Sequence, residues 1–281
     1  MAPGRVPPLA PVAGDPPVLS SEEGAARLRA VVQAVFDFVR AGRLDGLRAL
    51  DLGAGAGGIA VELALRGAAV TAVEGREANC EEIRALRDAH DLGERVQVLQ
   101  GDVRKLDWEA LGEFDVVVCS GLLYHLELPD VVALVADIRR ACRRLLVLDT
   151  ETAWGPVEER HIVDRAYSGH AYREHASEAS ASARLASRQA SLDNEQAFWL
   201  TRASVHALLH DAGFSSSWEL GGPGQPRRER RATVAGIVGE TVGPPALGPS
   251  PAQPSARPPE PLPGRVLRAR LAVARLAARR R

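Results

Sequence analysis

The sequence predicts an α/β fold in which helices cover both faces of a mostly parallel sheet. Three observations support this prediction. Short apolar runs alternate with helical patterns between residues 47 and 150, a glycine-rich turn follows the first run, and two further apolar runs close together end the ordered part. The chain has 281 residues, of which 46% are hydrophobic, so it can bury one large core.

The elements before residue 150 follow one another regularly. A first helix is expected over residues 22–40, because Ser20 or Ser21 can cap it and apolar residues recur at helical spacing. The alternation continues as strand "LRALDL", helix 57–66, strand "AVTAVEG", helix 76–90, strand "VQVLQGD", strand "FDVVVCSG", helix 129–142 and strand "RLLVLDT". Strands that are linked through helices pair in parallel.

The pattern changes after Thr150. Residues 151–196 are polar and of low complexity, and we expect an insert here that serves as a lid or recognises substrate, with a weak helix or a mobile lid over 177–191. A helix over 201–211 follows, capped by Thr201 and ended by Gly213. The runs "SSSWEL" and "RATVAGIV" are then two strands with a short connection, which makes them antiparallel.

The two ends of the chain differ from its body, residues 21–240. Residues 1–20 are Pro-rich and predicted to be a disordered arm. Residues 241–281 combine a Pro-rich linker with a tail that carries seven arginines in "GRVLRARLAVARLAARRR". The tail could form a basic amphipathic helix that makes a weak contact with an anionic surface, or it could be a solvated tail.

The net charge, the lack of long apolar stretches and the cysteine spacing argue against several classes of protein. The formal net charge of −1 gives no global case for nucleic-acid binding. No apolar stretch approaches the roughly 18 residues that span a bilayer, and the start of the chain lacks a signal-peptide pattern. The cysteines, Cys80, Cys119 and Cys142, have no metal-ligand spacing. We therefore expect a cytoplasmic protein without a membrane span.

The glycine-rich turn "LDLGAGAGGIA" fits two cofactor patterns. Gly53, Gly55 and Gly58 spell G-x-G-x-x-G, the dinucleotide pattern. Asp51, Gly53, Gly55 and Gly57 spell D-x-G-x-G-x-G, a pattern of S-adenosylmethionine (SAM) enzymes. A carboxylate at position 51 suits an ammonium group and would repel a pyrophosphate, so Asp51 favours SAM.

Two further acids stand at strand ends. Glu74 ends the second strand, where an acid can bind ribose hydroxyls in either pattern. Asp102 follows the third strand, where a carboxylate can accept a hydrogen bond from an adenine amino group. The antiparallel ending also favours SAM, because a dinucleotide fold is expected to continue in parallel.

The segments "LDLGAGAGG", "VEG", "GDV" and "FDVVVCSGLLYHL" together resemble the class I SAM-dependent methyltransferase family, in its small-molecule branch. The resemblance implies a Rossmann-like seven-stranded sheet whose last strand is antiparallel, with S-adenosyl-L-methionine as cofactor. The resemblance also implies a role for each residue. The methionine part of the cofactor would lie against Gly53, Gly55 and Gly57, with its amino group near Asp51. Glu74 would bind the ribose, Asp102 and Val103 would frame the adenine, and Cys119 and Ser120 would lie under the sulfonium.

Acceptor residues are expected after the fourth strand and in the insert. "SGLLYHLELPD" is similar to the G-x-L-Y-H segment of the tRNA wobble-uridine-modifying branch and of many small-molecule methyltransferases. Tyr124 would line the acceptor pocket, and His125 is the candidate catalytic base, although it could also simply cap a turn. The insert adds the expected substrate-binding residues Tyr172, Arg173 and His175. Trp199, just after it, is expected to bind substrate as well, although it could also pack in the core. The histidines and acids around them follow no recognised metal-ligand pattern, so no metal is predicted.

The leading hypothesis is a SAM-dependent methyltransferase with a small-molecule acceptor, namely a hydroxyl of a sugar or of a secondary metabolite. A tRNA-modifying enzyme is one alternative, based on the G-x-L-Y-H segment and the arginine-rich end. A NAD-binding oxidoreductase is a second, although Asp51 argues against it. A non-catalytic protein of the same fold, which would keep the cofactor without turnover, is the third.

Overall fold

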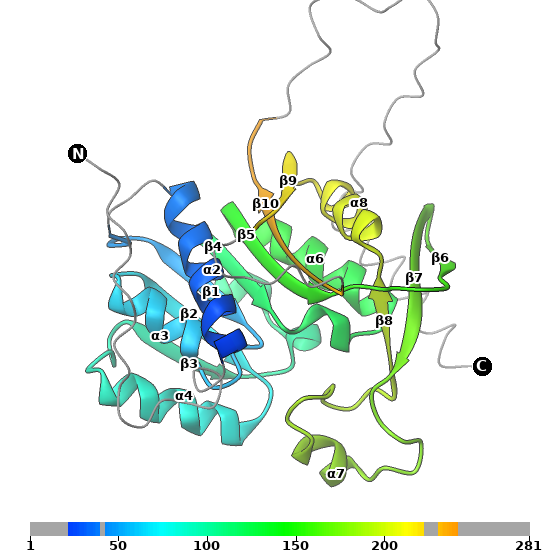
Figure 1. Ribbon diagram of the computed structural model, residues 1–281. Coiled ribbons are helices and arrows are strands. Elements are labelled where there is room, and N and C mark those ends of the chain that lie inside the picture. The colour runs from blue at the N-terminus through cyan, green and yellow to red at the C-terminus, as the bar shows by residue number, and fades with distance from the viewer. Residues whose placement is uncertain (1–21, 40–42, 222–229, 241–281) are drawn as a thin grey trace, which may run out of the picture.

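The computed structural model describes residues 22–39, 43–221 and 230–240. It contains a seven-stranded sheet in the order β3-β2-β1-β4-β5-β10-β9 and a three-stranded sheet in the order β6-β7-β8 (Figure 1). The predicted arm over 1–20, and the tail over 241–281 with its expected surface contact, lie outside the described residues. No helix in the described ranges is long and apolar enough to cross a membrane.

Five parallel strands form the first part of the large sheet. They are β1 (Arg48–Leu52), β2 (Ala69–Glu74), β3 (Val96–Gln100), β4 (Phe114–Ser120) and β5 (Cys142–Glu151). The helices between and before them are α2 (Glu22–Val39), α3 (Gly58–Leu65), α4 (Glu77–Ala89), the short α5 (Trp108–Leu111) and α6 (Leu128–Ala141). Each predicted element of this region is therefore present, with ends shifted by a residue or two.

Alternate residues of the strands face opposite sides of the sheet, and both sides are apolar. In β4, Val117 belongs to a cluster that contains residues of α6 and α8, whereas Val116 and Val118 belong to a cluster that contains residues of α2 and α3. All three valines are at most 1% exposed. This two-sided burial explains the continuous apolar runs in the sequence.

The end of the sheet is antiparallel, as predicted. β10 (Arg231–Ile237) lies between β5 and β9 (Ser216–Glu219) and runs antiparallel to both. The connecting helix α8 (Arg202–Ala212) begins where the Thr201 side chain accepts a hydrogen bond from the Ser204 amide. It ends at Gly213, whose φ of 96° is in the left-handed region that glycine tolerates.

The insert is more ordered than its composition suggests. It folds into β6 (Glu158–Ile162), β7 (Arg165–Arg173), the short helix α7 (Ala181–Ala186) and β8 (Gln196–Leu200). The strands β6 and β7 were not predicted because most of their residues are exposed or half-buried, with Ile162 and Tyr167 in the core. The short β8 adds Phe198 and Leu200 to that core. Figure 1 shows this small sheet beside α6 and α8, with α7 extending away from it.

Candidate functional site

A cavity of about 420 Å³ lies at the carboxyl ends of the parallel strands, where open α/β sheets bind their ligands. One wall comes from the glycine turn and the ends of β2 and β3, and the other from the turn after β4 and from the insert. The lining residues include Asp51, Gly53, Gly55, Glu74, Arg76, Asp102, Val103, Arg104, Ser120, Tyr124, His125, Arg188, Ser191, Leu192 and Asn194.

The backbone of the turn distinguishes between the two glycine patterns. Gly53, Gly55 and Gly57 have φ values of 68°, 56° and 84°, which disfavour any other residue, and Gly58 does not share this conformation. The glycines required by the fold are therefore those of D-x-G-x-G-x-G. Gly58 lines the cavity, however, whereas Gly57, which is expected against the methionine part, does not. A Cβ there would lie 3.0 Å from Ile83, so Gly57 allows the turn to pack against α4.

Asp51 provides a test of whether a cationic group fits this cavity. Its side chain is 1% exposed, and its Oδ2 atom has no hydrogen-bond partner among the described residues. Burial raises the pKa of Asp51 to about 7, a backbone hydrogen bond from Ala60 acts against this, and the charge of Glu74 adds to it. A buried carboxylate oxygen without a partner is costly, so an ammonium group is well suited to this position.

Glu74 is buried and held by the turn itself. Its Oε2 accepts a hydrogen bond from the Gly55 amide at 3.0 Å, and its Oε1 accepts one from the Arg76 amide at 2.9 Å. Each carboxylate oxygen has a second lone pair. Glu74 can therefore accept two more hydrogen bonds from neighbouring hydroxyls, as a ribose offers.

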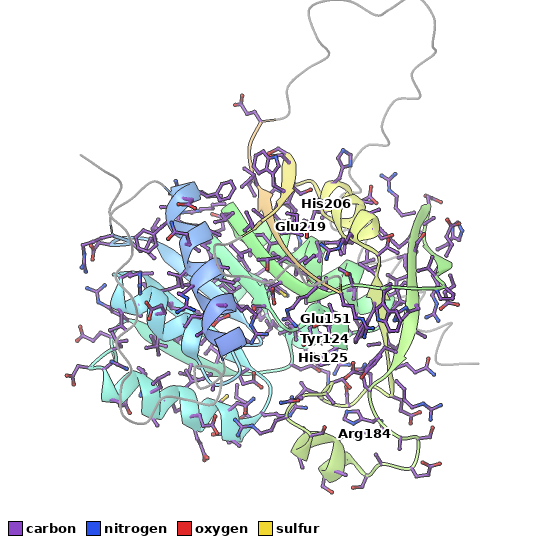
Figure 2. The ribbon with its side chains drawn as sticks, in the orientation of Figure 1. Tyr124, His125, Glu151, Arg184, His206 and Glu219 are labelled. Atoms are coloured by element: carbon purple, nitrogen blue, oxygen red, sulfur yellow. The ribbon has the colours of Figure 1, made fainter. Side chains whose placement is uncertain are left out.

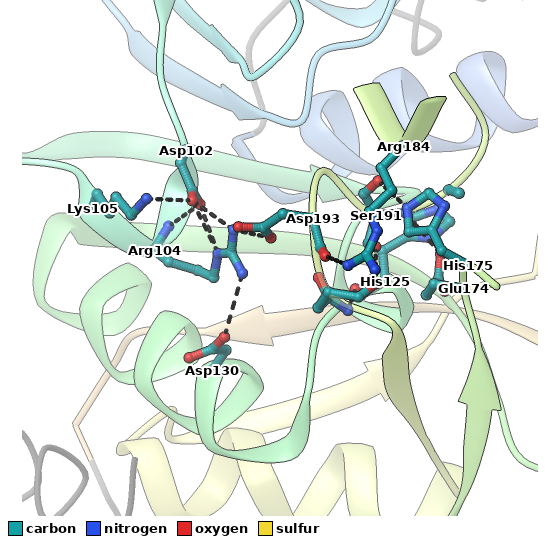
Figure 3. Close-up of polar contacts among 12 residues, drawn as sticks. Asp102, Arg104, Lys105, His125, Asp130, Glu174, His175, Arg184, Ser191 and Asp193 are labelled. Carbon is teal, nitrogen blue, oxygen red and sulfur yellow. Dashed lines mark hydrogen bonds and ion pairs between the residues drawn. The ribbon is translucent and has the colours of Figure 1, made fainter. Parts of the chain in front are cut away.

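Asp102 lies on the cavity wall but is already engaged. It caps the turn η1 (Val103–Lys105) and accepts from the Arg104 guanidinium at 2.7 Å, while Arg104 also reaches Asp193 of the insert at 2.6 Å (Figure 3). Burial raises the pKa of Asp102, but the hydrogen bonds from Arg104 outweigh it and leave the pKa below its usual value. Val103 lines the cavity beside it.

Cys119 and Ser120 are the last two residues of β4, and their side chains lie on opposite sides of the sheet. Ser120 lines the cavity, with its Oγ 3.5 Å from Asp149 Oδ1. Cys119 is fully buried in the core under α6 and does not line the cavity, which corrects its expected position under the sulfonium. Burial raises the pKa of its thiol to about 12, so it stays uncharged.

His125 is oriented by a buried acid. It lies in the turn η2 (Leu123–His125), and its Nδ1 is 2.9 Å from Oε2 of Glu174, whose side chain is 1% exposed. An ionised carboxylate only accepts, so this contact favours the tautomer with hydrogen on Nδ1, which leaves Nε2 as the proton acceptor. Tyr124 and His125 follow β4, and Glu151 ends the neighbouring strand β5 (Figure 2).

An aromatic row leads from this histidine to the surface. The ring centroids of Tyr124 and His125 are 4.2 Å apart. The Tyr124 ring lies edge-on to Trp199 with a centroid distance of 5.8 Å, and Trp199 stacks on Tyr172 with a centroid distance of 4.3 Å. His170 stacks on the same tryptophan at 5.8 Å. The predicted residues Tyr124, Trp199 and Tyr172 therefore lie together, and Tyr172 remains 44% exposed.

Two expected substrate-binding residues are placed elsewhere. Arg173 is exposed at the end of β7 opposite Gln196 and does not line the cavity. His175 is buried, and its Nε2 is 2.9 Å from the Ser191 carbonyl oxygen, so it supports the insert. Side chains alternate along this segment, so position in the sequence alone does not tell which of them face the cavity.

Several residues of the site were not predicted. Glu174 belongs to the polar cluster of the insert but was not singled out among its neighbours. Arg76, Ser191 and Arg231 carried no sequence signal; Arg231 donates hydrogen bonds to Asp149 and Glu151 and lies 5.5 Å from the ring of Tyr124. No group of three or more potential metal ligands is gathered among the residues that the structure describes.

Comparison with known proteins finds a methyltransferase domain in part of the chain. A family model described as "Methyltransferase domain" matches residues 49–144. The N-terminal domain of EvdMO1, solved with S-adenosylhomocysteine (SAH) bound, is 28% identical with a TM-score of 0.59, over 77% of this chain and 84% of that one. The chain thus contains a methyltransferase domain over residues 49–144 and has the fold of a SAH-bound structure, as class I SAM-dependent methyltransferases do.

Two more relatives extend the comparison of this methyltransferase. The ubiquinone biosynthesis O-methyltransferase of Azotobacter vinelandii is 39% identical over 106 residues, which are 37% of this chain and 41% of the relative. The match thus spans about two fifths of that relative. Magnesium protoporphyrin IX methyltransferase (ChlM) from Synechocystis PCC 6803 is 17% identical over 80% of this chain and 90% of that one, with a TM-score of 0.52, and shares the fold.

Proposed function

We propose that this methyltransferase transfers a methyl group from SAM to a hydroxyl of a small-molecule acceptor. The observation that carries the proposal is one cavity lined both by Asp51, a buried acid with one unpartnered carboxylate oxygen, and by His125, whose Nδ1 meets a buried carboxylate. The cofactor, when bound, supplies an electrophilic methyl group. Neither the tRNA-modifying nor the NAD-dependent alternative is favoured by the comparisons.

Each predicted cofactor residue on the cavity wall has a matching task in this proposal. Asp51 would bind the ammonium group, and Glu74 would accept from the ribose hydroxyls. Asp102 and Val103 would frame the adenine, and the backbone at Gly53 and Gly55 would lie close to the methionine part. Ser120 would lie near the reacting end, next to Tyr124 and His125.

His125 would act as the base. Its Nε2 would take the proton of the acceptor hydroxyl while the oxygen approaches the methyl carbon in line. The buried carboxylate of Glu174 would stabilise the imidazolium that results, because it contacts the opposite nitrogen at 2.9 Å. Removal of such a base typically costs 10²–10⁴-fold in rate.

A sugar is the acceptor that we propose. Aromatic faces bury apolar area well, and the row of Tyr124, Trp199 and Tyr172 offers such faces beside His125. A solved structure of the N-terminal domain of EvdMO1 in the presence of SAH and D-fucose is 29% identical, with a TM-score of 0.59.

The three buried, unpaired cysteines support our further proposal of a cytoplasmic location.

Calorimetric titration with SAM, SAH and NAD tests the cofactor first. We expect SAM and SAH to bind and NAD not to bind. If only NAD binds, the proposed function is wrong. A panel of sugars, sugar nucleotides, catechols and tRNA is then incubated with methyl-labelled SAM. Label on a sugar hydroxyl, lost in His125→Ala and His125→Gln, is the expected result; label on tRNA or on a catechol instead would contradict the sugar proposal.

A further inference from the structure

Part of the insert forms a wall of the proposed cofactor cavity. We call residues 187–194 the strap, and six of them line the cavity: Arg188, Gln189, Ala190, Ser191, Leu192 and Asn194. Leu192 lies directly over Gly75, where an added Cβ would be only 2.5 Å from its Cδ1 atom. The strap therefore covers the segment that follows the ribose-binding acid, Glu74.

Arg76 ties the strap to that acid. Its guanidinium donates to the carbonyl oxygens of Leu185 and Ser187 at 3.0 and 2.8 Å, and to those of Ala190 and Ser191 at 2.9 and 3.0 Å. Its own amide donates to Glu74 Oε1 at 2.9 Å. One residue thus holds the strap with its side chain and the ribose-binding carboxylate with its backbone.

Ser191 continues the connection toward the base. Its carbonyl oxygen accepts from Arg76, while its amide donates to Oε2 of Glu174 at 2.7 Å. The same Oε2 atom is 2.9 Å from Nδ1 of His125 (Figure 3). Asn194 adds a second link, because its side-chain amide donates to the His125 carbonyl oxygen at 2.9 Å.

Glu174, in the middle of this series of contacts, is buried and has few hydrogen-bond partners. Its side chain is 1% exposed, and its other oxygen, Oε1, has no hydrogen-bond partner among the described residues. The position of the carboxylate is thus set by Ser191 on one side and His125 on the other. A movement of the strap at Ser191 would remove one of the two contacts that place this carboxylate.

We propose that Arg76, Ser191 and Glu174 couple closure of the strap over the cofactor to the orientation of His125. Arg76 and Glu174 are positioning residues in this scheme, and the inference rests on the proposed function of His125. A ligand that contacts Glu74 beneath the strap favours the closed arrangement. In that arrangement Ser191 holds Glu174 in place, and His125 keeps Nε2 free to accept a proton. Cofactor binding therefore prepares the base before the acceptor arrives.

The first test needs no turnover. Ring-nitrogen NMR signals of His125 are recorded in ¹⁵N-histidine-labelled protein with and without saturating SAH, and assigned with His125→Gln. We expect SAH to increase the population with hydrogen on Nδ1 in the natural protein. Arg76→Ala should lose this response, and Glu174→Gln should give mixed tautomers, because an amide can accept or donate. An unchanged response in Arg76→Ala overturns the coupling.

The second test separates coupling from simple retention of the cofactor. Single-turnover methyl transfer is measured at saturating SAM for Arg76→Ala, Arg76→Lys, Glu174→Gln and the double variant. We expect each single variant to lose about 10- to 100-fold in rate, as for lost charge-assisted hydrogen bonds. The double variant should lose little more, because both changes break one chain of contacts.

Controls define what each outcome means. Arg143→Ala removes an exposed arginine that pairs with Glu113 far from the strap, and it should stay within about twofold of the natural rate. If Arg76→Ala weakens SAM binding but recovers the full rate at saturation, the strap only retains cofactor and the inference is wrong. If the natural protein transfers no methyl group to any acceptor, the proposed function fails, while the NMR response still decides the coupling. If Arg76→Ala does not fold, Arg76→Lys is measured in its place, because an ammonium cannot reproduce the forked contacts.

Discussion

Replacement of Asp51 by asparagine should stabilise the fold and impair cofactor binding. Burial raises the pKa of this carboxyl from 3.8 to about 7, so the folded protein prefers its neutral form. The stability of the natural protein is then highest, for this group, below about pH 4, and it is lost as the pH rises from about 4 to 7. Three pKa units correspond to about 4 kcal/mol, which is the upper bound of the gain in Asp51→Asn at about pH 8.

Urea unfolding without cofactor measures this gain. The difference in unfolding free energy between Asp51→Asn and the natural protein should be near zero at about pH 4 and grow toward about pH 8. Asp88→Asn, which changes an exposed acid on α4, is the matched control and should show no such growth. An Asp51→Asn protein that is no more stable at about pH 8 would refute the argument from burial.

The same variant tests the cofactor assignment. An amide in place of the carboxylate removes a charge-assisted hydrogen bond to the ammonium group, so the Kd for SAH should rise about 10- to 100-fold at about pH 8. In the natural protein the Kd should rise below about pH 7, because protonated Asp51 cannot pair with a cation. Equal SAH affinity in both proteins would show that Asp51 does not face the ligand.

Three further changes follow from the geometry. Glu74→Ala should weaken SAH binding by about 1–3 kcal/mol through lost ribose hydrogen bonds, measured by calorimetry; unchanged affinity would contradict the assignment. Gly57→Ala should lower the unfolding free energy by about 1–2 kcal/mol, because φ is 84° and its Cβ would meet Ile83 at 3.0 Å; a stable variant would contradict this. Trp199→Ala should raise the acceptor KM and leave the Kd for SAH unchanged, since Trp199 contacts Tyr124 and Tyr172 and does not line the cofactor cavity.

The part of the cavity that we propose for the cofactor could be located from the sequence because the residues that form it are local. Asp51 and the glycines stand at fixed spacing around one turn, and Glu74 ends the next strand, so strand and turn chemistry suffice. The same logic could have excluded Cys119. Successive residues of a strand face opposite sides, and if Ser120 faces the cavity then Cys119 faces the core.

The acceptor half depends on contacts between distant parts of the chain. Glu174 and His125 are 49 positions apart in the sequence, and they meet only because the insert folds back as a sheet. That sheet buries few side chains, so its strands lack the alternating pattern that reveals strands elsewhere. Arg76 was unremarkable in sequence, because its four acceptors are backbone carbonyls that any residue supplies.

The two ends of the insert meet, which affects how such enzymes can diversify. The Ala153 amide donates to the Leu200 carbonyl oxygen at 2.8 Å, so the chain leaves the large sheet and returns at one place. The family model ends at residue 144, before this stretch. Recombination could therefore exchange the stretch as a cassette and give an old catalytic body a new acceptor range. Because the strap lies within this stretch, such an exchange would also replace the cavity wall that the strap forms.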